Sequence, residues 1–136
     1  MLAFWFGESD EPTPAFIRDA AVRSLNAGET FYAHNLGLPE LREALSRYIG
    51  SLHRPVGADR IAVTSSGVNA LMLAMQALAG PGDEVVAVVP VWPNLPAQPA
   101  ILGGRVVRFS LEVHDAAWRL DLQALLHTVT QRTRVL

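Results

Sequence analysis

A segment around Ser66 carries residues whose types and spacing could bind an anion. Ser66, Gly67 and Val68 follow a β-branched run and open an apolar stretch of helical character. Backbone N–H groups at a helix N-terminus attract anions, glycine lets an anion approach the backbone closely, and the Ser66 hydroxyl could donate a further hydrogen bond. The alternative interpretation is that Ser66 only caps the helix.

A second candidate is Trp92, which comes shortly after the β-branched run at residues 84–89. Ligands of open α/β sheets bind beyond the carboxyl ends of the strands, and an indole ring there could stack on a flat aromatic ligand. The alternative, which the local sequence alone favours, is that Trp92 packs in the core. Tyr32 lies in a glycine-containing loop, where a tyrosine is ordinarily a surface anchor.

Several other kinds of catalytic group are missing from the sequence. There is no cysteine, and no Gly-x-Gly-x-x-Gly or Gly-x-Ser-x-Gly motif indicates a dinucleotide site or a serine hydrolase. All 11 basic residues are arginine, so no lysine amine of this chain can act as a nucleophile or form a Schiff base. The histidines have no metal-ligand spacing, and we expect no metal site; they are His34, His53, His114 and His127.

Composition restricts the partners. The formal net charge of -2 argues against nucleic-acid binding and gives no reason to bind an anionic membrane. Only 18% of the residues are charged, against about 25% in ordinary domains, which leaves apolar surface for a protein or small-molecule partner. The apolar run at residues 85–93 is shorter than the roughly 20 residues of a membrane helix. Residues 1–6 lack the basic region of a signal peptide, so we expect a cytoplasmic location.

The first part of the chain is predicted to hold two helices. Thr13 and Pro14 followed by residues 15–27 indicate a helix, with Thr13 as its N-cap residue and Pro14 in its first position. A second, amphipathic helix opens at Pro39.

From residue 61 the pattern alternates between strands and helices. A helix over residues 68–79 is apolar nearly all round and should be buried, and another helix begins after Asp121. We expect strands at residues 61–64, 84–89, 105–111 and 133–136. A Pro-rich stretch covers residues 90–99, and residues 100–104 are expected to end a short helix before the third of these strands. This order indicates βαβ units in an α/β domain with a mostly parallel sheet and helices on both faces. Since the last strand has only begun, we expect the domain to be incomplete.

Five blocks occur in a fixed order along the chain. They are Gly-Glu-Ser-Asp with Pro-Thr-Pro (residues 7–14), Tyr with Gly-Leu-Pro-Glu-Leu-Arg-Glu-Ala (32–44), the segment around Ser-Ser-Gly (63–71), Gly-Pro-Gly-Asp-Glu-Val with Trp-Pro-Asn (80–94) and Trp-Arg-Leu-Asp (118–121). In this order they resemble the class I/II aminotransferase family, which are fold-type-I enzymes that use pyridoxal 5'-phosphate (PLP). The resemblance covers essentially the whole chain.

The resemblance implies roles for the candidate residues. Ser66, Gly67 and the N–H of Val68 would hold the phosphate of PLP, and Trp92 would stack on its pyridine ring. Tyr32 would reach the phosphate of the neighbouring subunit's cofactor in a homodimer. Val68 departs from family members that carry a hydrogen-bonding side chain at this position, so it offers only its backbone.

The resemblance also implies a division of the chain. Residues 1–13 would form an N-terminal segment, in which Gly7 lies close to the substrate carboxylate. Residues 14–136 would form the first part of the PLP-binding large domain, truncated before the region of the Schiff-base lysine. Asp83 and Asp121 are more simply a turn residue and a helix cap than partners of the cofactor.

The implied activity is amino-group transfer between an amino acid and a 2-oxo acid. In the family this chemistry depends on a lysine, and the present chain has none, so it should hold no catalytic residue and be inactive alone. We therefore expect the N-terminal portion of a PLP-dependent aminotransferase. Two alternatives stay open, a non-catalytic PLP-binding or dimerisation fragment and a PLP-dependent lyase on the same scaffold.

Overall fold

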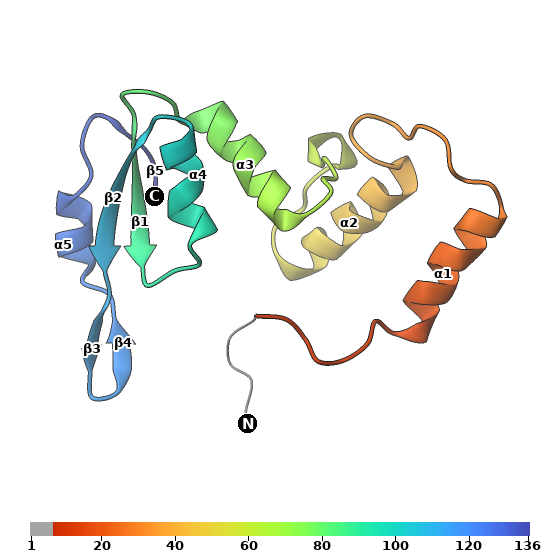
Figure 1. The fold of residues 1–136 in the computed structure, drawn as a ribbon, viewed down its shortest axis with the longest axis horizontal. Helices are drawn as coiled ribbons and strands as arrows, with labels where there is room; N and C mark the ends of the chain where they lie inside the picture. Colours follow the sequence, from red (N-terminus) through yellow and green to blue (C-terminus); the bar gives the residue numbers. More distant parts are fainter. Residues whose placement is uncertain (1–6) are drawn as a thin grey trace. The chain divides into compact units, whose positions relative to one another are not determined.

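A computed structural model describes residues 7–136, and the contacts divide the chain into two compact units that meet between Ile61 and Ala62. Within residues 7–61 the first unit holds two helices and a short 3-10 helix, and the second unit holds the parallel sheet (Figure 1). The prediction about a signal peptide concerns residues 1–6, which lie outside the described residues.

Both helices predicted for the first unit are confirmed, as α1 (Ala15–Asn26) and α2 (Pro39–Leu52). The prediction that Thr13 caps α1 is wrong, because Pro14 is the N-cap residue and no side chain caps this helix. Pro14 has an extended backbone with ψ 143°, which places the first helical residue one position later than predicted. The carbonyl of Thr13 instead accepts a hydrogen bond from the guanidinium of Arg18.

The chain returns along α2 through the 3-10 helix η1 (Ala58–Arg60). Arg42 of α2 binds the segment that follows α2. Its Nε donates to the carbonyl of Ile61 over 2.8 Å, and its Nη2 donates to the carbonyl of Ala58 over 2.6 Å. The strand predicted at residues 61–64 is therefore wrong. In the described part of the chain no strand lies alongside this segment to form a ladder with it.

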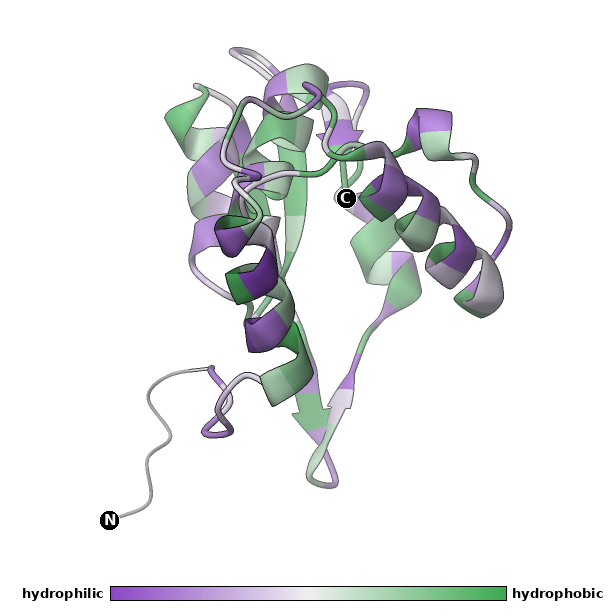
Figure 2. Cartoon of the chain, turned by 90° about the vertical axis from the view of Figure 1, so that its right-hand side faces the viewer, coloured by the Kyte–Doolittle hydropathy of each residue, from purple (hydrophilic) through white to green (hydrophobic). Residues whose placement is uncertain are grey.

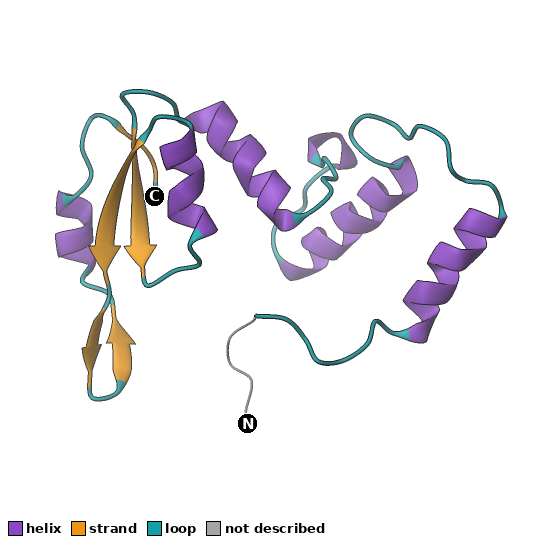
Figure 3. Ribbon diagram, in the orientation of Figure 1, coloured by secondary structure: helices purple, strands orange, loops and turns teal. Residues whose placement is uncertain are grey.

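A parallel sheet forms the centre of the second unit, as predicted (Figure 3). Its strands are β1 (Glu84–Val89), β2 (Arg105–Ser110) and β5 (Thr133–Val135), in the order β2-β1-β5. The central strand β1 has the sequence Glu-Val-Val-Ala-Val-Val and is coloured as hydrophobic along most of its length in Figure 2. Val85 and Val86 of β1 are buried, so the core of this unit lies against the first half of β1.

Two helices flank the sheet, α4 (Asn94–Ile101) and α5 (Leu122–His127), and Figure 1 shows them on opposite sides of it. The short helix predicted to end at residues 100–104 is confirmed, but α4 begins earlier, inside the stretch predicted as Pro-rich. Pro96 lies in its first turn, where a missing N–H leaves no intrahelical bond unmade. The predicted cap of α5 is confirmed, because the Asp121 carboxylate accepts a hydrogen bond from the N–H of Ala124 over 3.0 Å.

Helix α3 (Gly67–Leu78) precedes the sheet and packs against α4. The prediction of a helix here is confirmed, but the prediction that it is buried is wrong. None of its residues is buried, and the exposed fractions of Leu73 and Leu78 are 49% and 55%. Within its unit α3 packs against α4 on one side. Because the sequence of α3 is apolar on all sides, leucines on its other sides are exposed.

The sequence analysis missed a hairpin after β2. It consists of β3 (Glu112–His114) and β4 (Ala117–Arg119), which pair antiparallel. The turn residues Asp115 and Ala116 both have positive φ, 51° and 59°. Two-residue hairpin turns of this kind usually show Asn-Gly or Asp-Gly, and Asp-Ala does not carry that signal.

A buried carboxylate joins the amino ends of the three parallel strands. Glu84, 1% exposed, receives hydrogen bonds from Arg105 (3.0 Å) and from the Thr130 hydroxyl (2.7 Å), and Arg132 forms an ion pair with it over 3.0 Å. These partners come from β2 and from the segment before β5, so Glu84 links both neighbours of β1. The hydrogen bond from Thr130 and the charges of Arg132 and Arg105 lower the pKa of Glu84 from its ordinary value, against the opposing effect of burial.

Candidate functional site

The N-terminus of α3 begins at Ser66, whose backbone is extended. Its Oγ accepts a hydrogen bond from the N–H of Asn69 over 3.2 Å, and its carbonyl accepts one from the N–H of Ala70 over 3.0 Å. The Thr64 hydroxyl donates to the same carbonyl over 2.8 Å. Capping by Ser66 is therefore confirmed. Hydrogen bonds from Thr64, which precedes Ser66, and from Asn69 and Ala70, which follow it, stabilise the turn before α3.

This helix N-terminus keeps three donors for a ligand. In residues 7–136 no acceptor is recorded for the N–H groups of Gly67 and Val68 or for the hydroxyl proton of Ser66. The first turn of α3 contains no acidic residue that would repel an anion. A Cβ built on Gly67 meets no atom within 4 Å, so the space beside this residue is open. Three donors, a helix dipole and open space together suit an anion.

Trp92 lies in the loop between β1 and α4, and its carbonyl accepts a hydrogen bond from the N–H of Leu95 over 3.0 Å. The exposed fraction of Trp92 is 49%. The interpretation that Trp92 packs in the core is therefore wrong for this unit. The loop that carries Trp92 leaves the carboxyl end of the central strand, and Figure 1 shows the N-terminal end of α4 on the side of the β1 and β2 arrowheads.

A cavity of about 470 Å³ lies between α3 and α4. Ser66, Val68 and Asn69 line it from α3, and Asn94 and Gln98 line it from α4. The amide Nε2 of Gln98 donates to the carbonyl of Val68 over 3.0 Å. The structure thus places the candidate anion site of α3 beside the helix that follows Trp92.

The sequence analysis missed the contributions of Asn69, Asn94 and Gln98. The two from α4 were missed because Pro96 and Pro99 obscured where the predicted short helix begins. A signal was nevertheless present, since proline is favoured in the first turn of a helix. A helix starting after Trp92 would have brought Asn94 and Gln98 to one face at i, i+4.

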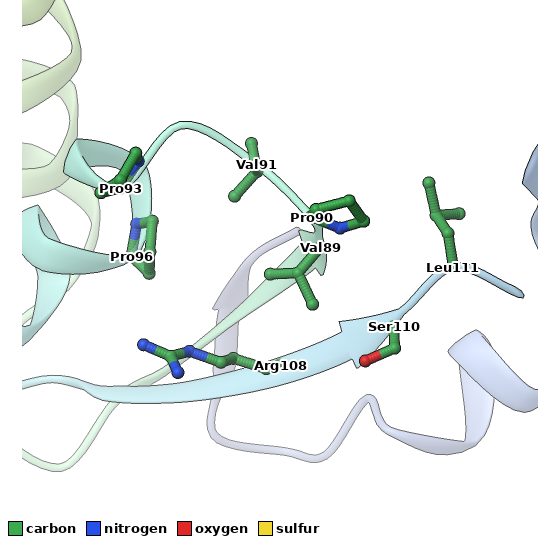
Figure 4. Close-up of a pocket in the computed structure, with 8 residues that line it drawn as sticks. All are labelled: Val89, Pro90, Val91, Pro93, Pro96, Arg108, Ser110 and Leu111. Atoms are coloured by element: carbon green, nitrogen blue, oxygen red, sulfur yellow. The ribbon is translucent and has the colours of Figure 1, made fainter. Parts of the chain in front are cut away.

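A second cavity, of about 520 Å³, opens at the carboxyl ends of β1 and β2 (Figure 4). Its walls are mainly apolar, with valine and proline from the loop that carries Trp92. Its two polar side chains are Arg108 and Ser110 of β2, and Figure 4 shows Arg108 extending towards Pro93 and Pro96. Trp92 itself is not among the residues that line this cavity.

Gly7 and Tyr32 belong to the first unit. Tyr32 is fully exposed in a loop, where it lines a surface cavity with Thr30, Phe31 and Ala33. Gly7 is also exposed, and a Cβ built on it meets nothing within 4 Å. The candidates therefore fall in two groups, with Ser66, Gly67, Val68 and Trp92 in the second unit.

The remaining acidic candidates have structural roles. Asp83 accepts hydrogen bonds from the N–H of Gly80 and from Nε of Arg134, both over 3.1 Å, and these bonds lower its pKa from the ordinary value. Together with the cap at Asp121, this confirms the simpler interpretation of both residues.

In residues 7–136 no group of three or more His, Cys, Asp or Glu side chains is arranged to hold a metal ion. None of the helices described has the length and apolar character of a membrane span.

Comparison with known proteins yields a family match and close relatives. The family model described as "Aminotransferase class I and II" matches residues 4–136. A probable aspartate/prephenate aminotransferase of Aquifex aeolicus is 34% identical over 100% of this chain and 34% of its own length. An aspartate aminotransferase of Thermotoga maritima is 40% identical over 74% of this chain and 27% of its own.

Solved structures give a consistent result. A mutant of the aspartate aminotransferase of Thermus thermophilus superimposes with a TM-score of 0.88 at 35% identity, covering 94% of this chain and 34% of that one. The present chain thus spans about a third of the length of the relatives it matches.

Proposed function

Because the chain belongs to the family of class I and II aminotransferases, we propose that it is the N-terminal portion of a PLP-dependent enzyme that moves an amino group between an amino acid and a 2-oxo acid. Residues 1–13 form the N-terminal segment in this proposal, and residues 14–136 form the first part of the PLP-binding large domain. The names of the relatives favour aspartate as the amino acid.

The observation that carries the proposal is the set of free donors at the start of α3. The N–H groups of Gly67 and Val68 and the hydroxyl of Ser66 suit a phosphate dianion, which accepts several hydrogen bonds and needs no opposing acid nearby. These residues therefore fit the phosphate of PLP. When bound, PLP supplies an electron sink for reactions at the α-carbon of an amino acid.

The other candidate residues have supporting roles in the proposal. Trp92, half exposed beside the strand end, offers an aromatic face to the pyridine ring. The full exposure of Tyr32 in the single chain supports contact with a second subunit, where its hydroxyl donates to the phosphate of that subunit's cofactor. Gly7, which leaves open space around it, lies next to the substrate carboxylate.

The direct test is a calorimetric titration of the full chain with pyridoxamine 5'-phosphate, which has no aldehyde to react with amines. We expect saturable binding that inorganic phosphate competes away and that the double variant Ser66→Ala, Trp92→Ala abolishes. The matched control is Ser51→Ala, Trp118→Ala, which removes an exposed serine and an exposed tryptophan elsewhere. No binding by the parent chain, or equal binding by the first double variant, would refute the proposed site.

The absence of lysine favours one second candidate function, a non-catalytic PLP-binding or dimerisation module. Both candidates use the same phosphate site, so the titration does not separate them. The intact mass of the native gene product does. A mass well above 14.8 kDa supports the aminotransferase, and a mass of 14.8 kDa supports the module.

A further inference from the structure

Gln98 of α4 is a buried amide with one hydrogen bond. Its exposed fraction is 6%, and its Nε2 donates to the carbonyl of Val68 over 3.0 Å. A carbonyl can only accept, so the end of the amide that meets it must be the NH2 group. Among the side-chain hydrogen bonds recorded within residues 7–136, this is the one that joins α3 to α4.

The bond from Gln98 continues through a single peptide group to Ser66. The carbonyl of Val68 and the N–H of Asn69 belong to the same planar peptide. Gln98 donates to its oxygen, and its N–H donates to the Oγ of Ser66 over 3.2 Å. Hydrogen bonds connected in this way orient and polarise one another. Because the Ser66 oxygen is occupied as an acceptor, its hydroxyl proton is left for an anion.

The second polar atom of the amide gives an independent reason to assign a role to Gln98. Its Oε1 is buried and has no hydrogen-bond partner in the described residues. A buried acceptor without a partner destabilises a fold, and methionine would occupy a similar volume without that penalty. The hydrogen bond from Nε2 to the carbonyl of Val68, rather than packing, is therefore the reason for an amide at this position.

We propose that Gln98 is a positioning residue that orients the Ser66 hydroxyl towards the phosphate group of the ligand by fixing the peptide between Val68 and Asn69. The inference rests on the proposed function, since it assumes a phosphate at the start of α3. The same hydrogen bond also holds α4, the helix that follows Trp92, beside the proposed phosphate site. Gln98 itself does not touch the reacting atoms.

The test compares Gln98→Met with Ser66→Ala and with the double variant, by titration of each full chain with pyridoxamine 5'-phosphate. Gln98→Met should weaken binding about tenfold, the effect expected for the loss of one oriented hydrogen bond. In the Ser66→Ala background the same change should have no further effect, because the hydroxyl it orients is absent. The control is Gln76→Met, the same change at an exposed position of α3, which should leave binding unaltered.

Thermal unfolding separates positioning from a structural role. Gln98→Met should melt at the same temperature as the parent chain or higher, because removal of the unpaired buried acceptor offsets the loss of the hydrogen bond from Nε2. Additive losses of affinity in the double variant, unaltered binding in Gln98→Met, or a lower melting temperature together with weaker binding would overturn the inference. If the parent chain binds no pyridoxamine 5'-phosphate at all, the proposed function fails first and this inference fails with it.

Discussion

Single residues at the start of α3 can combine a structural role with the proposed ligand-binding role. Ser66 uses its oxygen as a helix cap, and its proton remains available to an anion. The two interpretations that the sequence left open for Ser66 are therefore compatible, because a hydroxyl can accept and donate at the same time. Replacing Ser66 affects both roles, so stability must be measured alongside binding in every variant at this position.

A substitution at Gly67 tests the proposed ligand-binding role while leaving the cap formed by Ser66 in place. A Cβ at Gly67 meets no atom of the chain, so we expect Gly67→Ala to fold as well as the parent or better, by up to about 0.5–1 kcal/mol from the higher helix propensity of alanine. The new methyl group would occupy the space through which an anion approaches, and affinity for pyridoxamine 5'-phosphate should fall about tenfold or more. Calorimetric titration and thermal unfolding measure the two effects.

Gly80→Ala is the matched control for that substitution. Its Cβ also meets nothing within 4 Å, and Gly80 lies in the turn before β1 rather than at the helix N-terminus. It should leave affinity unchanged. Equal affinity of Gly67→Ala and the parent chain would show that the ligand does not approach Gly67.

At the scale of elements, the carboxylates at the amino ends of the strands hold the sheet together. Glu84 binds partners next to both neighbours of β1, and Asp83 binds Arg134 of β5. This edge is opposite to the one from which the Trp92 loop leaves. The ion pairs therefore stabilise the sheet that supports the candidate site, and they lie away from that site.

These carboxylates predict how stability depends on pH. The pKa values of Asp83 and Glu84 lie below their ordinary values of 3.8 and 4.5 in the folded chain. The unfolded chain therefore takes up protons first as the pH falls, and the stabilisation that is complete above these ordinary values is lost progressively below them. We expect the melting temperature to drop between about pH 5 and about pH 3.

Glu84→Gln separates the contribution of Glu84 from that of Asp83. The amide keeps the shape of the side chain but loses the charge that attracts Arg105 and Arg132. It should melt several degrees lower than the parent at neutral pH and show a shallower decline in acid, as followed by circular dichroism. A decline as steep as that of the parent chain would assign the acid sensitivity to other groups.

For the whole molecule, the prominent feature is exposed apolar surface. Phe16 and Leu25 of α1, Leu73 and Leu78 of α3 and Tyr32 are all exposed. Each unit, taken by itself, therefore has exposed apolar side chains, and exposed apolar surface is the kind that a protein partner covers. These exposed side chains support the homodimer proposed above.

The whole chain should not catalyse transamination. With aspartate, a 2-oxo acid and PLP supplied together, we expect no sustained formation of product amino acid, because no side-chain amine is present to move a proton at the α-carbon. Chromatographic analysis of the amino acids measures this, with an intact aspartate aminotransferase as the positive control. Sustained turnover by the purified chain would contradict the prediction.

The sequence by itself determined the family, the parallel sheet and most of the helices. These follow from local information, since periodicity, caps such as Asp121 and the order of motifs such as Gly-Pro-Gly-Asp-Glu-Val depend on neighbouring residues. The local information failed at residues 61–64, which have strand-like residues but no partner strand among residues 7–136, and at the start of α4, which lies in the Pro-rich stretch.

Only the tertiary structure decided which side chains meet. Glu84 lies 46 residues from Thr130, and Gln98 lies 30 residues from Val68, so neither contact has a signal in the local sequence. The half-exposed state of Trp92 and the open faces of α3 depend in the same way on which elements pack against them. Burial and hydrogen bonding between distant residues are set by packing, and packing is a property of the folded chain as a whole.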